Sequence, residues 1–254
     1  MGILDLFSLK GKNALVTGSG QGLGSGIAIA LAQADANVTL HNYDRVHEDV
    51  IEEVKKTGVR FIARAGDVCD PAVCRMLVDD TVKEFGAIDI LVNNAGTILR
   101  APAEDYPEEF WNKVMDTNLN AVWRLSQYAG RLMLAQGKGK IINTASLMSF
   151  QGGLLIASYV ASKGAVGQLT KALANEWAGK GVNVNAIAPG YMATDNTAPL
   201  RADAVRSTHI LGRIPMGRWG EPSDLGGAAV FLASEASNYI NGHILVVDGG
   251  WLCR

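Results

Sequence analysis

Short apolar runs rich in β-branched residues recur along the chain, separated by longer segments whose apolar positions are spaced as in helices. Seven runs predict strands, at residues 13–17, 37–41, 60–64, 88–93, 140–146, 182–188 and 243–248. Helical spacing predicts helices near residues 22–34, 46–57, 71–85, 107–136, 158–179 and 222–233. Strands that are apolar along their whole length are typical of parallel sheets buried on both faces. The alternation therefore predicts a doubly wound, Rossmann-type α/β fold, with a parallel sheet of about seven strands and helices on both faces.

The stretch from residue 190 to residue 220 interrupts this alternation because it carries no long apolar run. It is too long for an ordinary connection between elements. We expect one or two short helices here that form a lid over a substrate site, with a static surface excursion as the alternative. No Pro/Ser-rich linker or charge run divides the chain, so residues 1–254 are expected to form a single domain.

The overall charge and the residue spacings narrow the range of partners. The formal net charge of −2 argues against an electrostatic footprint for nucleic acid or for an anionic membrane surface. The chain shows neither a signal-peptide pattern at its start nor an apolar stretch approaching ~20 residues. Its cysteines and histidines lack the spacings of redox pairs and metal sites. These features predict a cytoplasmic protein without a resident metal, whose partner is a small molecule.

A glycine-rich stretch, "VTGSGQGLGSGIA" at residues 16–28, ends the first predicted strand and opens the first predicted helix. Glycines at such a turn let backbone N–H groups and a helix N-terminus approach a pyrophosphate. The spacing Gly-x-x-x-Gly-x-Gly departs from the usual Gly-x-Gly-x-x-Gly, and an ordinary strand-to-helix turn is the alternative. The residues expected to contact a dinucleotide here are Gly18, Ser19, Gln21, Gly22, Leu23 and Gly24.

The end of the second predicted strand, "LHNYDR", should meet the adenosine ribose. We place Asn42 at the strand tip, followed by Tyr43 and Asp44. A desolvated 2′-phosphate without a cation is costly, and Gln21 stands in the glycine turn where a phosphate clamp would need arginine. NAD is therefore the expected cofactor, and Arg45 keeps NADP open as the alternative.

The stretch "SYVASKGAV", residues 158–166, sets Tyr159 and Lys163 four positions apart. On a helix this spacing puts both side chains on one face, and an ammonium near a phenol lowers the pKa of the phenol from about 10. Ser146 ends the fifth predicted strand thirteen residues before Tyr159, and "NNAG", residues 93–96, follows the fourth. All of these segments reach the carboxyl edge of the predicted sheet, where ligands bind in such folds.

Together, "TGSGQGLG", "NNAG", Asn118 in "DTNLN", Ser146, "YVASK" and "PGYMAT" resemble the short-chain dehydrogenase/reductase family, over essentially the whole chain. The resemblance implies that Tyr159 is the general acid/base, that Ser146 polarises the substrate oxygen, and that Asn118 holds a water of the proton relay. It implies that Lys163 binds the nicotinamide ribose and lowers the pKa of Tyr159. Besides Tyr159, Lys163 and the residues named above, the expected cofactor contacts are Asp67, Val68, Asn94, Ala95, Gly96, Pro189, Gly190, Met192 and Thr194.

The later half is most similar to the group within this family that comprises 2-deoxy-D-gluconate 3-dehydrogenases, also described as 2-dehydro-3-deoxy-D-gluconate 5-dehydrogenases. The similarity lies in residues 149–153, 183–203, 213–225 and 246–254. It implies NAD-dependent interconversion of a secondary alcohol and a ketone on a six-carbon sugar acid, by a homotetramer. Gluconate 5-dehydrogenases are close to this group and are an alternative.

A sugar acid carries a carboxylate, which favours a cation with forked donors. Arg100, on the loop after the fourth predicted strand, is the first candidate, and Gln151, Ser146 and Tyr159 complete the expected substrate contacts. The rival cations lie on the predicted lid, at Arg201, Arg206, Arg213 and Arg218.

Two further functions stay open. A 3-oxoacyl carrier-protein reductase would use the same catalytic residues with NADPH, and would need an apolar groove and a basic docking surface, for which Lys138, Lys140 and Lys180 are candidates. A dinucleotide-sensing scaffold would keep the fold without the chemistry, but the complete set of Ser146, Tyr159 and Lys163 argues against it.

Overall fold

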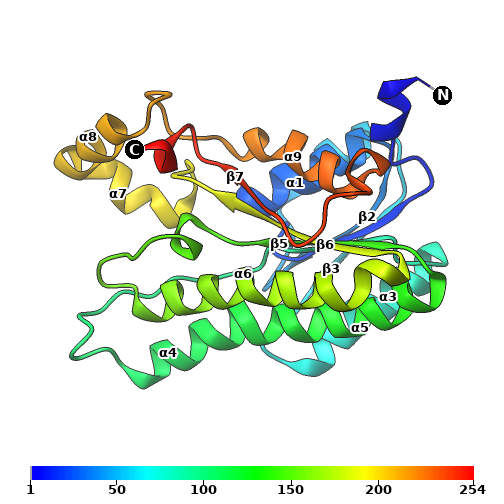
Figure 1. The fold of residues 1–254 in the computed structure, drawn as a ribbon, viewed down its shortest axis with the longest axis horizontal. Coiled ribbons are helices and arrows are strands. Elements are labelled where there is room, and N and C mark those ends of the chain that lie inside the picture. Colours follow the sequence, from blue (N-terminus) through cyan, green and yellow to red (C-terminus); the bar gives the residue numbers. More distant parts are fainter. Residues whose placement is uncertain (1) are drawn as a thin grey trace.

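The computed structural model describes residues 2–254, in which seven parallel strands form one sheet in the order β3-β2-β1-β4-β5-β6-β7 (Figure 1). The strands are β1 (Asn13–Val16), β2 (Asn37–Asn42), β3 (Phe61–Ala65), β4 (Ile90–Asn93), β5 (Gly139–Thr144), β6 (Val182–Pro189) and β7 (Ile244–Val247). The strand order reverses direction between β1 and β4, and such a switch point is where open α/β sheets bind ligands. The predicted doubly wound fold is confirmed.

Helices cover both faces of the sheet (Figure 1). One face carries α1 (Gly22–Gln33), α2 (Glu48–Lys56) and α9 (Gly226–Ala233), and the other carries α3 (Pro71–Phe85), α4 (Glu108–Met115), α5 (Ala121–Gln136) and α6 (Ala157–Trp177). The buried apolar side chains accordingly form two main clusters, one on each face. Short 3₁₀ turns lie at Ile3–Phe7, Leu147–Ser149, Ala178–Lys180, Asp195–Thr197, Pro222–Leu225, Glu235–Ser237 and Trp251–Cys253.

The helix predicted over residues 107–136 is interrupted by a π-helical segment, Asp116–Asn120. There the N–H of Ala121 donates to the carbonyl of Asp116, five residues earlier instead of four. The extra residue leaves the apolar spacing on either side almost unchanged, so the sequence pattern could not reveal it. Segments of this kind occur frequently at functional sites.

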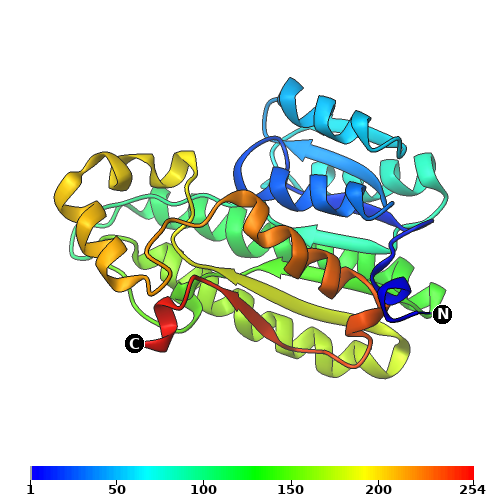
Figure 2. The ribbon, with the colours of Figure 1, turned by 90° about the horizontal axis from the view of Figure 1, so that it is seen from above.

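The stretch from residue 190 to residue 220 forms two short helices, α7 (Ala198–Ala202) and α8 (Ala204–Arg213), which confirms the predicted helical content. Asp203 begins α8, because its carboxylate accepts hydrogen bonds from the N–H groups of Val205 and Arg206. Figure 2 shows these helices beyond the carboxyl ends of the strands, with the C-terminus beside them. Movement of this segment as a lid remains a prediction.

Between residues 2 and 254, no helix combines the length and apolar character needed to cross a bilayer.

Candidate active site

A cavity of about 850 Å³ opens at the carboxyl edge of the sheet, below α7 and α8. Its walls come from the segments that follow β1 to β6, together with α6, the predicted lid and Trp251. Most of the residues singled out from the sequence line it: Gly18, Gln21, Gly22, Leu23, Asn42, Tyr43, Asp67, Val68, Asn94, Ala95, Gly96, Arg100, Ser146, Gln151, Tyr159, Lys163, Pro189, Gly190 and Thr194.

Four predicted site residues do not line this cavity: Ser19, Gly24, Asn118 and Met192. Ser19 is fully buried, and its hydroxyl donates to the carbonyl of Val16, so the side chain supports the turn from beneath. Met192 is buried in the core cluster beside α1 and α9. These side chains therefore support the wall and do not form its surface.

The glycine turn is shaped for close backbone approach. Gly18 has a φ of +63°, and a Cβ there would lie 2.8 Å from the Cα of Ala95. A Cβ on Gly24 would lie 2.2 Å from the carbonyl oxygen of Gly18. Gln21 precedes α1 without capping it through its side chain. The first N–H groups of α1 are thus available to an anion, and the turn fits a dinucleotide pyrophosphate.

Thr17 joins the glycine turn to the segment after β4. Its hydroxyl accepts hydrogen bonds from the N–H groups of Asn94 (3.0 Å) and Ala95 (3.1 Å). The side-chain amide of Asn94 in turn donates to the carbonyls of Thr17 and Gly18, both at 3.0 Å. These bonds hold two neighbouring loops in one fixed position.

Asn42 is the last residue of β2, as predicted for the strand tip. Its Nδ2 donates to the carboxylate of Asp44 (3.2 Å) and the carbonyl of Arg45 (2.7 Å), which leaves Oδ1 as an acceptor. Gly20 allows this packing, because a Cβ there would lie 2.6 Å from Asn42 Cγ. Tyr43 lines the cavity with its side chain largely exposed, whereas Arg45 does not line it.

His41, which sequence reasoning missed, supports the cofactor turn from within the sheet. Its Nδ1 accepts from the N–H of Gly18 (3.2 Å), so the proton sits on Nε2, which donates to the carbonyl of Gly66 (3.0 Å). Burial lowers the pKa of His41, which keeps the ring neutral as this pattern requires. No distinct signal marked it in the sequence, because β2 also carries the polar residues Asn37, Thr39 and Asn42.

Lys113 on α4 was also missed, because nothing in its spacing relates it to the strand ends. Its ammonium lies 3.0 Å from the carboxylate of Asp67 and 5.8 Å from the ring centroid of Tyr43. Burial alone would raise the pKa of Asp67, but the N–H of Cys69 and the Lys113 ammonium together lower it. The three side chains form one wall of the cavity near the tip of β2.

Tyr159 and Lys163 lie one turn apart on α6, as predicted. Lys163 is only 4% exposed, and its ammonium donates to the carbonyl of Thr144 (2.5 Å), the last residue of β5. The ammonium lies 5.8 Å from the centroid of the Tyr159 ring. Ser146 accepts a hydrogen bond from the N–H of Met148 (3.2 Å), and its hydroxyl lies near the phenol of Tyr159.

The electrostatics differ from the simple expectation that Lys163 lowers the pKa of Tyr159. Burial raises the pKa of Tyr159, while the hydrogen bond from Ser146 and the positive charge of Arg100 act in the opposite direction. Burial also lowers the pKa of Lys163 to about 8. Burial therefore dominates the pKa values of both groups.

Asn118 holds the loop that follows β4. Its Oδ1 accepts from the N–H of Thr97 (2.8 Å), and its Nδ2 donates to the carbonyl of Thr97 (2.9 Å) and the hydroxyl of Ser162 (3.3 Å). Both N–H groups of the side-chain amide are thus engaged, and Oδ1 accepts one hydrogen bond. A water held at this position would bind Oδ1 or a backbone group of the π-helical segment, Asp116–Asn120.

The five candidate arginines separate into two classes. Arg100, Arg206 and Arg213 line the cavity. Arg201 does not line the cavity, although it donates to the backbone carbonyl of Thr194 on the cavity wall (3.1 Å). Arg218 forms an ion pair with a neighbouring aspartate at a separate small cavity.

A family model described as enoyl-(acyl carrier protein) reductase matches residues 18–252. The chain is 55% identical over 254 residues to a 2-dehydro-3-deoxy-D-gluconate 5-dehydrogenase of Pseudoalteromonas atlantica, covering 99% of this chain and 100% of the relative. The protein belongs to the short-chain dehydrogenase/reductase family. The chain is also 54% identical over 257 residues to a 2-dehydro-3-deoxy-D-gluconate 5-dehydrogenase of Bacillus subtilis, and both chains are covered completely.

Solved short-chain dehydrogenase/reductase structures share the whole fold. A protein of Agrobacterium tumefaciens proposed to be a 2-deoxy-D-gluconate 3-dehydrogenase, solved with bound NADP, matches at a TM-score of 0.93 and 49% identity, covering 98% of this chain and 100% of that chain. A Burkholderia cenocepacia gluconate 5-dehydrogenase in complex with NADP and tartrate matches at a TM-score of 0.93 and 40% sequence identity, and both chains are covered completely. The protein is therefore an NAD(P)-dependent alcohol dehydrogenase or ketoreductase, and the alternative of a non-enzymatic scaffold is wrong.

Proposed function

We propose that the protein interconverts a secondary alcohol and a ketone on a six-carbon sugar acid of the 2-dehydro-3-deoxy-D-gluconate type, with NAD as the cofactor. The observation that carries this proposal is the placement of Ser146, Tyr159 and Lys163 in one cavity with three arginines. Four full-length relatives at 53–55% identity carry the name 2-dehydro-3-deoxy-D-gluconate 5-dehydrogenase, which supports the same substrate class.

Each catalytic side chain has a role that its contacts support. In the oxidation direction, Tyr159 removes the proton of the substrate hydroxyl, and in reduction it returns that proton to the ketone oxygen. Ser146 accepts the N–H of Met148 and its hydroxyl lies beside the Tyr159 phenol, so the hydroxyl proton is placed for donation to a substrate oxygen held there. A bound nicotinamide supplies the hydride acceptor or donor.

Lys163 lies beside the Tyr159 ring, and burial lowers the pKa of its amine to about 8, so this amine releases its proton more readily than an exposed lysine does. Its hydrogen bond to the carbonyl of Thr144 fixes the ammonium between β5 and α6. We propose that Lys163 binds the nicotinamide ribose and passes the Tyr159 proton toward solvent. The π-helical segment around Asn118 would hold the water that receives this proton.

The groups around Asn42 support NAD over NADP as the cofactor. The Oδ1 of Asn42 is suited to accept a hydrogen bond from a ribose hydroxyl, and a phosphate oxygen at the same position would meet an acceptor. The cation on this wall, Lys113, is already paired with Asp67, and Arg45 lies outside the cavity lining. Since solved relatives hold NADP, both cofactors belong in the test.

The rival reaction, reduction of a carrier-protein-bound 3-oxoacyl group, finds less support. Of the three lysines considered for a docking surface, Lys138 lies 3.7 Å from the carboxylate of Asp89. Lys140 donates to Asn183 (3.1 Å) and Asn238 (2.8 Å). These ammonium groups are engaged within the chain, and the arginines in the cavity favour an anionic substrate over an acyl chain.

The test is a screen of sugar acids and acyl thioesters against NAD and NADP, followed at the absorbance of the reduced cofactor. We expect turnover of 2-dehydro-3-deoxy-D-gluconate-type substrates and a higher kcat/KM with NAD. Tyr159→Phe should abolish turnover and leave cofactor affinity largely intact, because it removes the proton donor and keeps the ring. Turnover restricted to acyl thioesters would reject the substrate class, and near wild-type kcat in Tyr159→Phe would reject the mechanism.

A further inference from the structure

We propose that Arg206 and Arg213 of α8 hold the substrate's carboxylate, and that Arg100 does not. The assignment rests on the proposed function, since it presupposes a sugar acid. It places the cation that selects the substrate on the predicted lid, away from the loop that follows β4.

The two arginines share one face of α8. Positions 206, 210 and 213 are spaced by four and three residues, which stacks their side chains along a single helix face. Between the arginines, Ile210 packs into an apolar cluster with Tyr191 and Trp251. Both arginines line the cavity, and the guanidinium of Arg213 lies 4.1 Å from the centroid of the Trp251 ring.

Neither guanidinium forms an ion pair with a carboxylate among residues 2–254. The acidic residues on the cavity wall are Asp67, which pairs with Lys113, and Asp195, which forms no ion pair within the same part of the chain. Arg206 and Arg213 are exposed residues that border one cavity without a counter-ion, and their positive potential is one that a bidentate carboxylate would neutralise.

Arg100 and the lid arginines act on different tyrosines of the cavity wall. The charge of Arg100 opposes the effect of burial on the pKa of Tyr159. The lid arginines instead oppose the effect of burial on the pKa of Tyr191. The two sets of cations therefore serve different parts of the cavity.

This separation fits a substrate whose reacting carbon is remote from its carboxylate. In a sugar acid that reacts at C5, four carbon–carbon bonds separate the reacting carbon from C1, or about 5 Å in an extended chain. A carboxylate bound at Arg100 would favour reaction closer to C1. The assignment of the carboxylate to α8 therefore applies to a substrate that reacts at C5, as the proposed function supposes.

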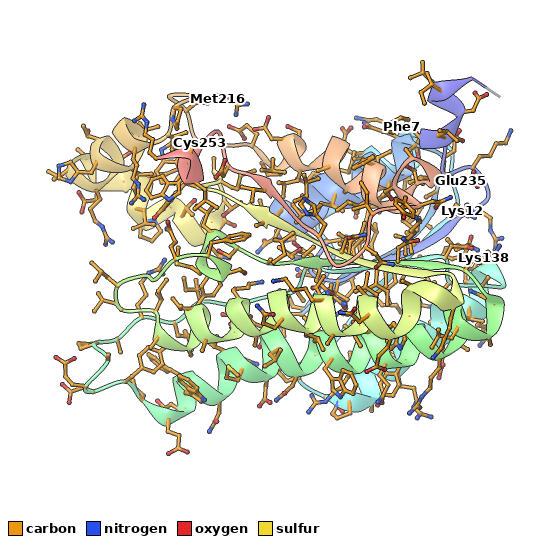
Figure 3. All side chains as sticks on the ribbon, in the orientation of Figure 1. Phe7, Lys12, Lys138, Met216, Glu235 and Cys253 are labelled. Carbon is orange, nitrogen blue, oxygen red and sulfur yellow. The ribbon has the colours of Figure 1, made fainter. Side chains whose placement is uncertain are left out.

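The C-terminal turn completes the subsite. The indole N–H of Trp251 donates to Oε1 of Gln151 (3.1 Å), which turns the amide N–H groups of Gln151 toward other partners. Figure 3 labels Cys253 in this turn, beside α8 and on the same side as Met216, while Lys12 and Lys138 mark the opposite end of the sheet. The predicted substrate contact Gln151 is thus tied to the same corner as Arg213.

The test compares 2-dehydro-3-deoxy-D-gluconate with its uncharged primary amide, using Arg206→Gln, Arg213→Gln, the double variant, Arg100→Gln and the lid control Arg201→Gln. The single variants should raise KM for the acid about 10-fold, and the double variant about 100-fold, with little change for the amide. Arg100→Gln should lower kcat for both compounds, and Arg201→Gln should leave the acid-to-amide ratio unchanged. An unchanged ratio in the double variant, or loss of the ratio in Arg100→Gln, would overturn the assignment.

A binding measurement separates this assignment from the proposed function. If the wild-type enzyme turns over neither compound, the proposed function is wrong, and calorimetric titration with tartrate still reports on the arginine pair. Weaker tartrate binding by the double variant than by Arg201→Gln would support a carboxylate site on α8. Equal affinity in the two variants would reject it.

Discussion

Replacing Lys163 by methionine should change the pH dependence of stability. Lys163 is 4% exposed, and burial lowers its pKa from 10.5 to about 8. Between these values the unfolded chain binds more protons than the folded chain, so the free energy of unfolding rises with pH. At about 1.36 kcal/mol per pH unit, the wild-type protein gains about 2 kcal/mol between about pH 8 and about pH 9.5. A methionine cannot contribute this gain.

Thermal unfolding of the wild type, Lys163→Met and the exposed control Lys171→Met, from about pH 7 to about pH 9.5, measures the effect. Lys171 lies on the same helix, so the control carries the same substitution without the burial. The wild type and Lys171→Met should gain roughly 4–8 °C relative to Lys163→Met over this range. If the melting temperatures of the three proteins change with pH by the same amount, burial does not lower the pKa of Lys163. The same Lys163→Met preparation should show a lower kcat and weaker cofactor binding.

Three further outcomes are expected. Gly24→Ala should lower the free energy of unfolding by about 1–3 kcal/mol and weaken cofactor binding, because its Cβ would press on the Gly18 carbonyl. The control Gly227→Ala has open space around its Cβ and should change neither thermal melts nor cofactor titrations. Tyr43→Arg should move the kcat/KM preference toward NADP by on the order of 1–3 kcal/mol, unless the wild type already prefers NADP, which would contradict the placement of Asn42. Light scattering at micromolar concentration should show a homotetramer, since α5 exposes part of its apolar surface, and a monomer mass would exclude it.

The features that the sequence predicted well depend on local spacing. A strand, a glycine turn and a helix follow one another within residues 13–33, and Tyr159 and Lys163 share one helix turn. Chain geometry over such short distances leaves few alternatives, so the motifs identified their positions at the edge of the sheet. Asn42 at the strand tip followed from the same short-range argument.

The features that the sequence could not predict depend on how distant segments meet. His41 supports the cofactor turn only because Gly18 and Gly66 approach it from two other loops. Lys113 reaches Asp67 from a helix more than forty positions away, as the bond across 46 positions shows. The proposed choice among five arginines likewise depends on the path of α8, whereas the sequence alone favoured Arg100, on the loop after β4.

The proposal separates the catalytic groups, on α6, from the arginines that bind the carboxylate, on α8, and the packing of these two helices agrees with it. α6 buries nine of its residues, Lys163 among them, so the groups that move the proton are held by the core. α8 buries none of its residues, and elements with so few packed side chains open at low free-energy cost. A carboxylate bound between Arg206 and Arg213 would then contribute to holding the lid closed over Tyr159. On this basis a substrate without the carboxylate loses the closure of the site together with the contact itself.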